Sequence, residues 1–117
     1  MYICAMKSTE LLKGTLKTVV LKLLAENERM YGYEMTQRVK TLTAGKLEIT
    51  EGALYPTLHK LEAEGLVTVE KVKVGRRTRK YYTLTPSGSA ATTSRLEEFE
   101  EFVQTMRLIF NPKTERS

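Results

Sequence analysis

The sequence predicts a mainly α-helical domain that carries one small β-hairpin. Apolar residues recur at steps of three and four in four separate stretches, which is the spacing of amphipathic helices. Between the third and fourth stretches the spacing changes to alternation on both sides of a glycine, which is typical of a hairpin. The chain has 117 residues, 41% of them apolar, which is enough for one core and too few for a large catalytic cleft between two domains.

The first helix is expected from about Ser8 to Glu26, with Ser8 or Thr9 as its N-cap. Its apolar stripe is broad enough to cover a core and some additional surface, and consists of Leu12, Leu16, Val19, Val20, Leu23 and Leu24. The second helix is expected within residues 30–42, where Met35, Val39 and Leu42 share one face. A short extended segment is expected over residues 46–50.

The third helix is expected over residues 50–65, with Leu54, Leu58 and Leu61 on its buried face. Gly65 is well placed to end it. Pro56 cannot donate a hydrogen bond to the carbonyl four residues back, so we expect a distorted first turn or a late start to the regular helix.

The hairpin is expected from Val67 to Leu84 around a turn that begins at Gly75. Its first strand contains two pairs of valines with opposite parity, at 67 and 69 and at 72 and 74, so keeping all four on one side requires a bulge near residues 70–71. Residues 71–80 carry six basic side chains and no acidic one. The hairpin therefore has a basic tip.

The last helix is expected to begin at Thr85, as N-cap, with Pro86 in the first helical position, and to reach about Phe110. Its apolar residues repeat at the three- and four-residue spacing of a helix–helix seam: Leu96, Phe99, Val103, Met106 and Phe110. A terminal helix this apolar on a domain this small is expected to pack against a partner chain.

Three helices followed by a two-stranded basic hairpin is the order of a winged helix-turn-helix. In that fold the third helix enters the DNA major groove, the second braces it, and the hairpin reaches along the backbone or into the minor groove. The net charge of +5 agrees with an acidic partner. A winged helix that serves protein–protein contact alone, without DNA, remains the alternative.

This organisation assigns residues 1–84 to the winged helix-turn-helix, 85–112 to a C-terminal dimerisation helix and 113–117 to a tail. An enzyme is not expected, because the only histidine lies on the expected DNA face and no glycine-rich phosphate loop is present. A single cysteine, Cys4, excludes an internal disulfide framework, and with one histidine it leaves little material for a metal site. No apolar run approaches the ~20 residues of a membrane helix, so we expect a soluble, cytoplasmic protein without cofactor or metal.

Several motifs resemble the PadR family of bacterial transcriptional regulators: LLKGTLKTVVLKLLAE, MYGYE, ITEGALYPTLHKLEAEGLV and GRRTRKYYTLTPSG, within about residues 11–88. The resemblance is to the short branch with a single C-terminal helix. It implies a homodimer in which the last helix clasps the first helix of the other chain, and a repressor whose operator affinity falls when an effector binds. A twofold dimer in turn requires an inverted-repeat operator in double-stranded DNA. The implied interface residues are Leu12, Leu16, Leu96, Phe99, Val103, Met106 and Phe110.

The candidate DNA-contacting residues come from both helices and from the hairpin. On the third helix we expect Ala53, Thr57 and Lys60 opposite the core, flanked by Tyr55 and His59. A packing role is the alternative for Tyr55. Tyrosines that open the second helix lie where its N-terminus can face a phosphate, with packing around the turn as the alternative role. The full set is Tyr31, Tyr33, Tyr55, Thr57, Lys60, Arg76, Arg77, Arg79 and Lys80. Tyr81 and Tyr82 point to opposite sides of their strand, so one of them is expected to pack on the core.

Phe99 is the candidate effector-binding residue. Some drug-sensing members of this short branch have a pore at the dimer centre that is lined by an aromatic residue at the position of Phe99. The best-known drug binders carry Trp there. A small planar aromatic molecule is the implied effector. The alternative is that Phe99 and its symmetry mate pack together and fill the dimer axis.

Overall fold

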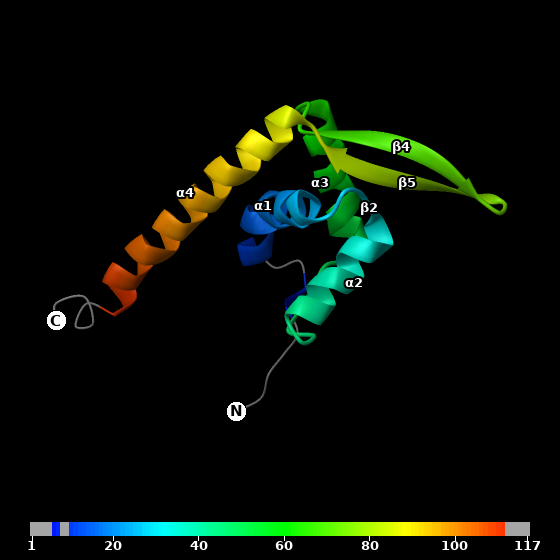
Figure 1. The fold of residues 1–117 in the computed structure, drawn as a ribbon. Coiled ribbons are helices and arrows are strands. Elements are labelled where there is room, and N and C mark those ends of the chain that lie inside the picture. The colour runs from blue at the N-terminus through cyan, green and yellow to red at the C-terminus, as the bar shows by residue number, and fades with distance from the viewer. Residues whose placement is uncertain (1–5, 8–9, 112–117) are drawn as a thin grey trace.

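The computed structural model describes residues 6–7 and 10–111, which form a cluster of three helices with a β-hairpin and a long terminal helix projecting from it (Figure 1). Cys4, the proposed N-caps Ser8 and Thr9, and the tail at 113–117 lie outside the described residues. The elements, in order, are β1 Met6–Lys7, α1 Glu10–Glu26, β2 Met30–Tyr31, α2 Gly32–Leu42, β3 Leu47–Glu48, α3 Glu51–Ala63, β4 Val67–Val74, β5 Arg77–Leu84 and α4 Pro86–Phe110. The predicted fold class is confirmed.

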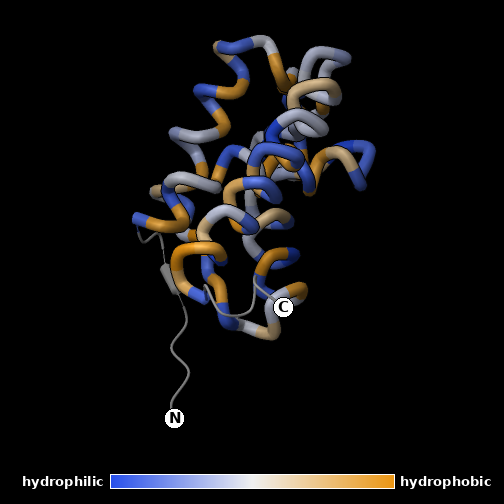
Figure 2. The backbone as a smooth tube through the Cα atoms, turned by 90° about the vertical axis from the view of Figure 1, so that its left-hand side faces the viewer, coloured by the Kyte–Doolittle hydropathy of each residue, from blue (hydrophilic) through white to orange (hydrophobic). Residues whose placement is uncertain are grey.

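The core lies where α1, α2, α3 and the base of the hairpin meet. Helix α1 contributes the largest share, with Leu12, Leu16, Val20, Leu21, Leu23 and Leu24 all buried. Figure 2 shows hydrophobic and hydrophilic positions alternating along the helices, as one-sided burial requires. The prediction for Leu42 is wrong: it is 59% exposed, because it is the last residue of α2 and lies beyond the core.

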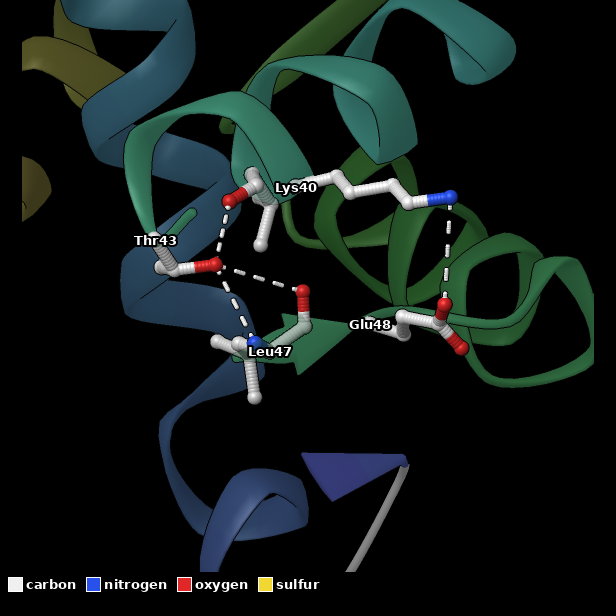
Figure 3. Close-up of polar contacts among 5 residues, drawn as sticks. Lys40, Thr43, Leu47 and Glu48 are labelled. Atoms are coloured by element: carbon white, nitrogen blue, oxygen red, sulfur yellow. Dashed lines mark hydrogen bonds and ion pairs between the residues drawn. The ribbon is translucent and has the colours of Figure 1, made fainter. Parts of the chain in front are cut away.

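The connection between α2 and α3 is held by Thr43 (Figure 3). Its Oγ1 donates to the Val39 carbonyl at 2.8 Å and accepts from the Leu47 N–H at 3.1 Å. Ala44 and Gly45 reverse the chain with φ of +53° and +79°. These contacts fix β3 beside the end of α2, where it pairs in parallel with β1. The expected extended segment is therefore present.

Helix α3 starts directly after Thr50, whose Oγ1 accepts from the Ala53 N–H at 3.2 Å. Of the two outcomes expected from Pro56, the late start is wrong, because the helix runs from Glu51 through the proline, which is exposed to water. The helix ends as predicted at Gly65, with φ of +77°. The N–H groups of Gly65 and Leu66 then donate back to the Glu62 and Leu61 carbonyls, a Schellman motif.

The antiparallel sheet has the order β2–β5–β4 and two different faces. Met30, Tyr82 and Val69 lie opposite one another across the three strands, on the face that packs on the core. The expected bulge is wrong, since β4 and β5 pair in continuous register from Val67–Leu84 to Val74–Arg77. Residues 72 and 74 therefore lie on the opposite face from 67 and 69, and Val74 is 41% exposed.

Helix α4 is fastened to the base of the hairpin by Thr85. The Thr85 Oγ1 accepts from the Gly88 N–H at 2.9 Å and donates to the Gly65 carbonyl at 2.7 Å, and its N–H donates to the Leu66 carbonyl at 3.0 Å. Only Gly88 and Thr92 of this helix are buried. Figure 1 shows α4 and the hairpin leaving the helical cluster in opposite directions. Among the described residues, no helix combines the length and hydropathy that a membrane span requires.

Candidate nucleic-acid interface

A groove of ≈ 680 Å³ lies between the hairpin and the N-terminal ends of α2 and α3. It is lined by Tyr31, Gly32, Tyr33, Glu51, Tyr55, Val74, Arg77, Thr78, Arg79 and Lys80. Six of the nine predicted DNA-contacting residues thus lie together, although they come from segments far apart in the sequence. Thr57, Lys60 and Arg76 lie outside its lining.

The hairpin presents its cations to solvent. The turn at Gly75, with φ of +64°, places Arg76 and Arg77 at the tip, and both are exposed. Lys71, Lys73 and Lys80 are exposed along the strands. The register places Lys71, Lys73 and Lys80 on one face of the hairpin and Arg77 on the other, so with no acidic residue between 71 and 80 both faces are basic and attract polyanions.

The outward face of α3 differs from the predicted one. Ala53 packs against the core, and Thr57 is half-buried with its Oγ1 donating to the Ala53 carbonyl at 3.1 Å. The prediction that these two residues lie opposite the core is wrong, because each directly precedes a buried leucine and so borders the buried stripe. Lys60 is exposed as expected. The free face of the helix carries Gly52, Pro56, His59, Lys60 and Ala63.

Tyr55 connects α3 to the start of α2. Its ring is half-buried, packs against the core and also lines the groove. A Cβ at Gly32 would lie 2.6 Å from the Tyr55 hydroxyl oxygen, so the glycine makes room for the tyrosine. This is a packing position, and it brings the first turns of α2 and α3 against each other.

The remaining tyrosines differ in their surroundings. Tyr33 is 55% exposed at the start of α2. Tyr31 is half-buried; the Arg79 guanidinium lies 4.0 Å above its ring centre, and the Tyr81 ring meets it edge-on at 5.5 Å. Tyr82 is the buried member of its pair, as the alternation predicts, and burial raises the pKa of its hydroxyl.

Sequence reasoning missed Arg29 and Glu70 in this region. Arg29 lies over the Tyr81 ring at 4.0 Å from its centre and donates from Nη1 to Glu70 Oε1 at 2.8 Å. The signal that could have found them is pairing register, because Glu70, Tyr81 and Tyr31 lie directly opposite one another across the sheet.

The expected dimer residues fall into two groups. Leu12 and Leu16 are 5% and 3% exposed within this chain, because they belong to its own core, so they leave little surface for another protomer. On α4, Leu96, Val103 and Met106 are half-buried, while Phe99 and Phe110 are 40% and 71% exposed. The exposed apolar surface of α1 and α4 also includes Leu11, Phe102, Leu108 and Ile109.

Residues 20–94 match the transcriptional regulator PadR-like family. The chain belongs to this family. Over 95 residues, 81% of this chain and 85% of the relative, it is 36% identical to the transcriptional regulator Rv3488 of Mycobacterium tuberculosis. It is also 30% identical, over 74% of its length, to the transcriptional regulator YqjI of Escherichia coli, although the match covers only 40% of that protein.

Solved structures of PadR-like proteins share the fold. A transcriptional regulator from Clostridium thermocellum superposes with a TM-score of 0.77 at 28% identity, covering 86% of this chain and 94% of that one. PadR of Bacillus subtilis, solved in complex with operator DNA, superposes with a TM-score of 0.63 at 32% identity. That match covers 69% of this chain and 46% of the Bacillus protein.

Proposed function

We propose that this PadR-like chain is a sequence-specific DNA-binding regulator. The observation that carries the proposal is the groove between the basic hairpin and the first turns of α2 and α3. The operator complex of Bacillus subtilis PadR supports it, since that protein has the same fold. In this arrangement α3 enters the major groove, and the hairpin cations contact phosphates or the minor groove.

The side chains divide into two kinds of contact. Exposed arginines at the hairpin tip neutralise phosphates, which requires only charge and reach. The free face of α3 offers Lys60 and His59 but no outward Arg or Asn pair, so selectivity rests partly on DNA shape. Binding is therefore expected to depend steeply on salt.

The test replaces Arg76 and Arg77 by alanine and measures duplex binding by fluorescence anisotropy over a range of salt concentrations. Affinity for all sequences should fall, and the salt slope should drop by roughly one for each phosphate that is no longer neutralised. A control in which Lys13 and Lys22 on α1 are replaced by alanine changes the net charge equally, outside the groove. Equal effects of the two pairs would contradict a specific role of the hairpin. A wild-type chain that binds no duplex would instead favour a protein-interaction module.

We propose that the protein forms a homodimer through α4. Its outer half exposes Phe102, Ile109 and Phe110 at 57%, 63% and 71%, which is costly in water, because burying each such side chain is worth roughly 1.5–3 kcal/mol. Deleting residues 96–117 should give a monomer with weak DNA binding; a truncated chain that still sediments as a dimer would contradict this. A twofold dimer requires an inverted-repeat operator with half-sites about one helical turn apart, or a multiple of it.

We propose further that the dimer is a repressor that a planar aromatic molecule releases. Phe99 is 40% exposed on α4, so two copies of it can flank a gap at the dimer axis. The test titrates planar aromatic cations against the wild type and Phe99→Ala, following ligand binding and operator release. Equal binding by both proteins, or binding that leaves operator affinity unchanged, would refute the effector role. Transcription from the bound promoter, measured with and without the protein, distinguishes repression from activation.

A further inference from the structure

The outer face of the sheet carries an unbroken stack of charged and aromatic side chains. Glu70 Oε1 accepts from Arg29 Nη1 at 2.8 Å, and the Arg29 guanidinium lies 4.0 Å above the centre of the Tyr81 ring. The Tyr81 ring meets the Tyr31 ring edge-on at 5.5 Å and 75°. The Arg79 guanidinium lies 4.0 Å above the centre of the Tyr31 ring, and its Nη1 donates to the Tyr81 hydroxyl at 3.4 Å.

This stack spans the only place where the hairpin is paired with the rest of the described chain. Strand β2 contributes two residue pairs, Met30–Tyr82 and Tyr31–Tyr81, whereas residues 71–80 pair only with one another. A two-stranded hairpin is by itself marginally stable in water. Its orientation is therefore set at its base: by Val67 and Tyr82 in the core on the inner face, and by the stack on the outer face.

The stack also reaches the helices of the groove. Tyr31 is the N-cap of α2, and its N–H donates to Glu34 Oε1 at 3.1 Å within the first turn. Gly32, the next residue, lies against the ring of Tyr55 on α3. A displacement of the hairpin relative to Tyr31 thus changes the angle between the basic hairpin and both helix ends.

We propose that Arg29 and Tyr81 are positioning residues, which fix the basic hairpin at one angle to α2 and α3 so that its cations meet the DNA backbone together. The inference rests on the proposed DNA-binding function. Neither residue lines the groove. Arg29 is half-exposed and ion-paired, and a surface ion pair alone is worth little, so its expected contribution comes from the planar stacking that a lysine cannot reproduce.

The decisive variant is Arg29→Lys, which keeps the charge and removes the planar guanidinium. Operator affinity should fall by roughly three- to tenfold, because the lysine keeps the charge but not the planar stacking on the Tyr81 ring. Arg107→Lys makes the same exchange on α4 and should leave affinity unchanged. Tyr81→Leu should resemble Arg29→Lys, whereas Tyr81→Phe, which retains the ring, should stay near the wild type.

Two readouts separate positioning from mere stability. If the hairpin is misplaced, its cations no longer reach the phosphates and the salt slope falls although the net charge is unchanged; partial unfolding lowers affinity at every salt concentration without changing the slope. In addition, Arg29→Lys should have little further effect in a chain that already carries Arg76→Ala and Arg77→Ala. Equal losses of affinity in both backgrounds with an unchanged slope, or wild-type affinity of Arg29→Lys, would overturn the proposal.

A measurement without DNA keeps this proposal apart from the proposed function. In a Lys73→Cys variant whose Cys4 is replaced by serine, a nitroxide label can be attached to the hairpin alone. The label broadens the NMR signals of nearby amides of α2, and the pattern of broadening depends on the angle of the hairpin. Arg29→Lys should change this pattern and Arg107→Lys should preserve it; identical patterns in both would overturn the positioning role. A wild-type chain that binds no duplex would overturn the proposed function as well, whereas normal binding by Arg29→Lys overturns this inference alone.

Discussion

Replacing Gly88 by alanine should loosen the attachment of α4 to the hairpin base. A Cβ at this position would collide with the Leu66 carbonyl oxygen and lie 3.0 Å from the Leu84 Cδ2. The carbonyl is backbone and is already held by the Thr85 N–H at 3.0 Å, so it cannot move without loss of that bond. Overpacking costs roughly 1–3 kcal/mol and the hydrogen bond about 1 kcal/mol.

Alanine also favours the helix by about 1 kcal/mol relative to glycine, which offsets part of this cost. The net expectation is a loss of roughly 1–3 kcal/mol, with the melting temperature falling by about 4 °C for each kcal/mol. Urea and thermal unfolding at one fixed protein concentration, followed by circular dichroism, measure both quantities.

Gly14 in α1 is the matched control, since nothing lies within 4 Å of a Cβ built there. Gly14→Ala should raise the free energy of unfolding by roughly 0.5–1 kcal/mol through helix propensity alone. If both alanine variants are stabilised alike, the close approach of α4 to Leu66 does not exist in solution. Such a result would refute a tightly packed α4 junction.

Three further expectations concern single positions. Ala44→Gly should stabilise the chain by up to roughly 1 kcal/mol, because alanine there has a φ of +53°; a loss of stability in urea unfolding would contradict this. Lys17 Nζ, 2.7 Å from Glu64 Oε2, lowers the pKa of that carboxyl below its usual 4.5, so the pair stabilises the fold above that pH and ceases to do so as acid protonates it. Glu64→Gln should therefore lower stability at neutral pH and match the wild type in acid; a deficit that persists in acid would exclude the ion pair. Burial raises the pKa of Tyr82, so stability should fall as the pH rises above about 10, and Tyr82→Phe should reduce that fall in an alkaline titration.

The order of elements was predictable because each depends on local signals. Gly65 ends α3 through its positive φ, and Thr85 followed by Pro86 starts α4, as capping preferences indicate. Burial of Leu54, Leu58 and Leu61 follows from helical spacing. The basic hairpin tip and six of the residues around the groove were also identifiable, because charge and turn residues mark them directly.

Other features depend on contacts between distant segments, which local spacing does not record. The valines of opposite parity indicated a bulge only under the assumption that all of them face the core. Val74 lines the groove instead, on the sheet face opposite the core, so a regular register suits both valine pairs. Strand β2 was missed because two residues carry no periodic signal, and its existence depends on pairing with β5 about fifty residues later.

The stack on the outer sheet face shows why the candidate site could be located more easily than its geometry. Charge counting identified Arg79 as a cation available to phosphate, but its guanidinium lies over the Tyr31 ring, and its hydrogen bond to the Tyr81 hydroxyl raises its pKa. A cation held on an aromatic face loses less side-chain freedom when it meets a phosphate than one that is free in water. Within the described part of the chain, the exposed arginines at the tip have no such aromatic support, so under the proposed function we expect them to provide charge and the stack to provide direction. Under this proposal the hairpin needs both charge and direction to favour one register on DNA, and only the charge is visible in the amino-acid composition.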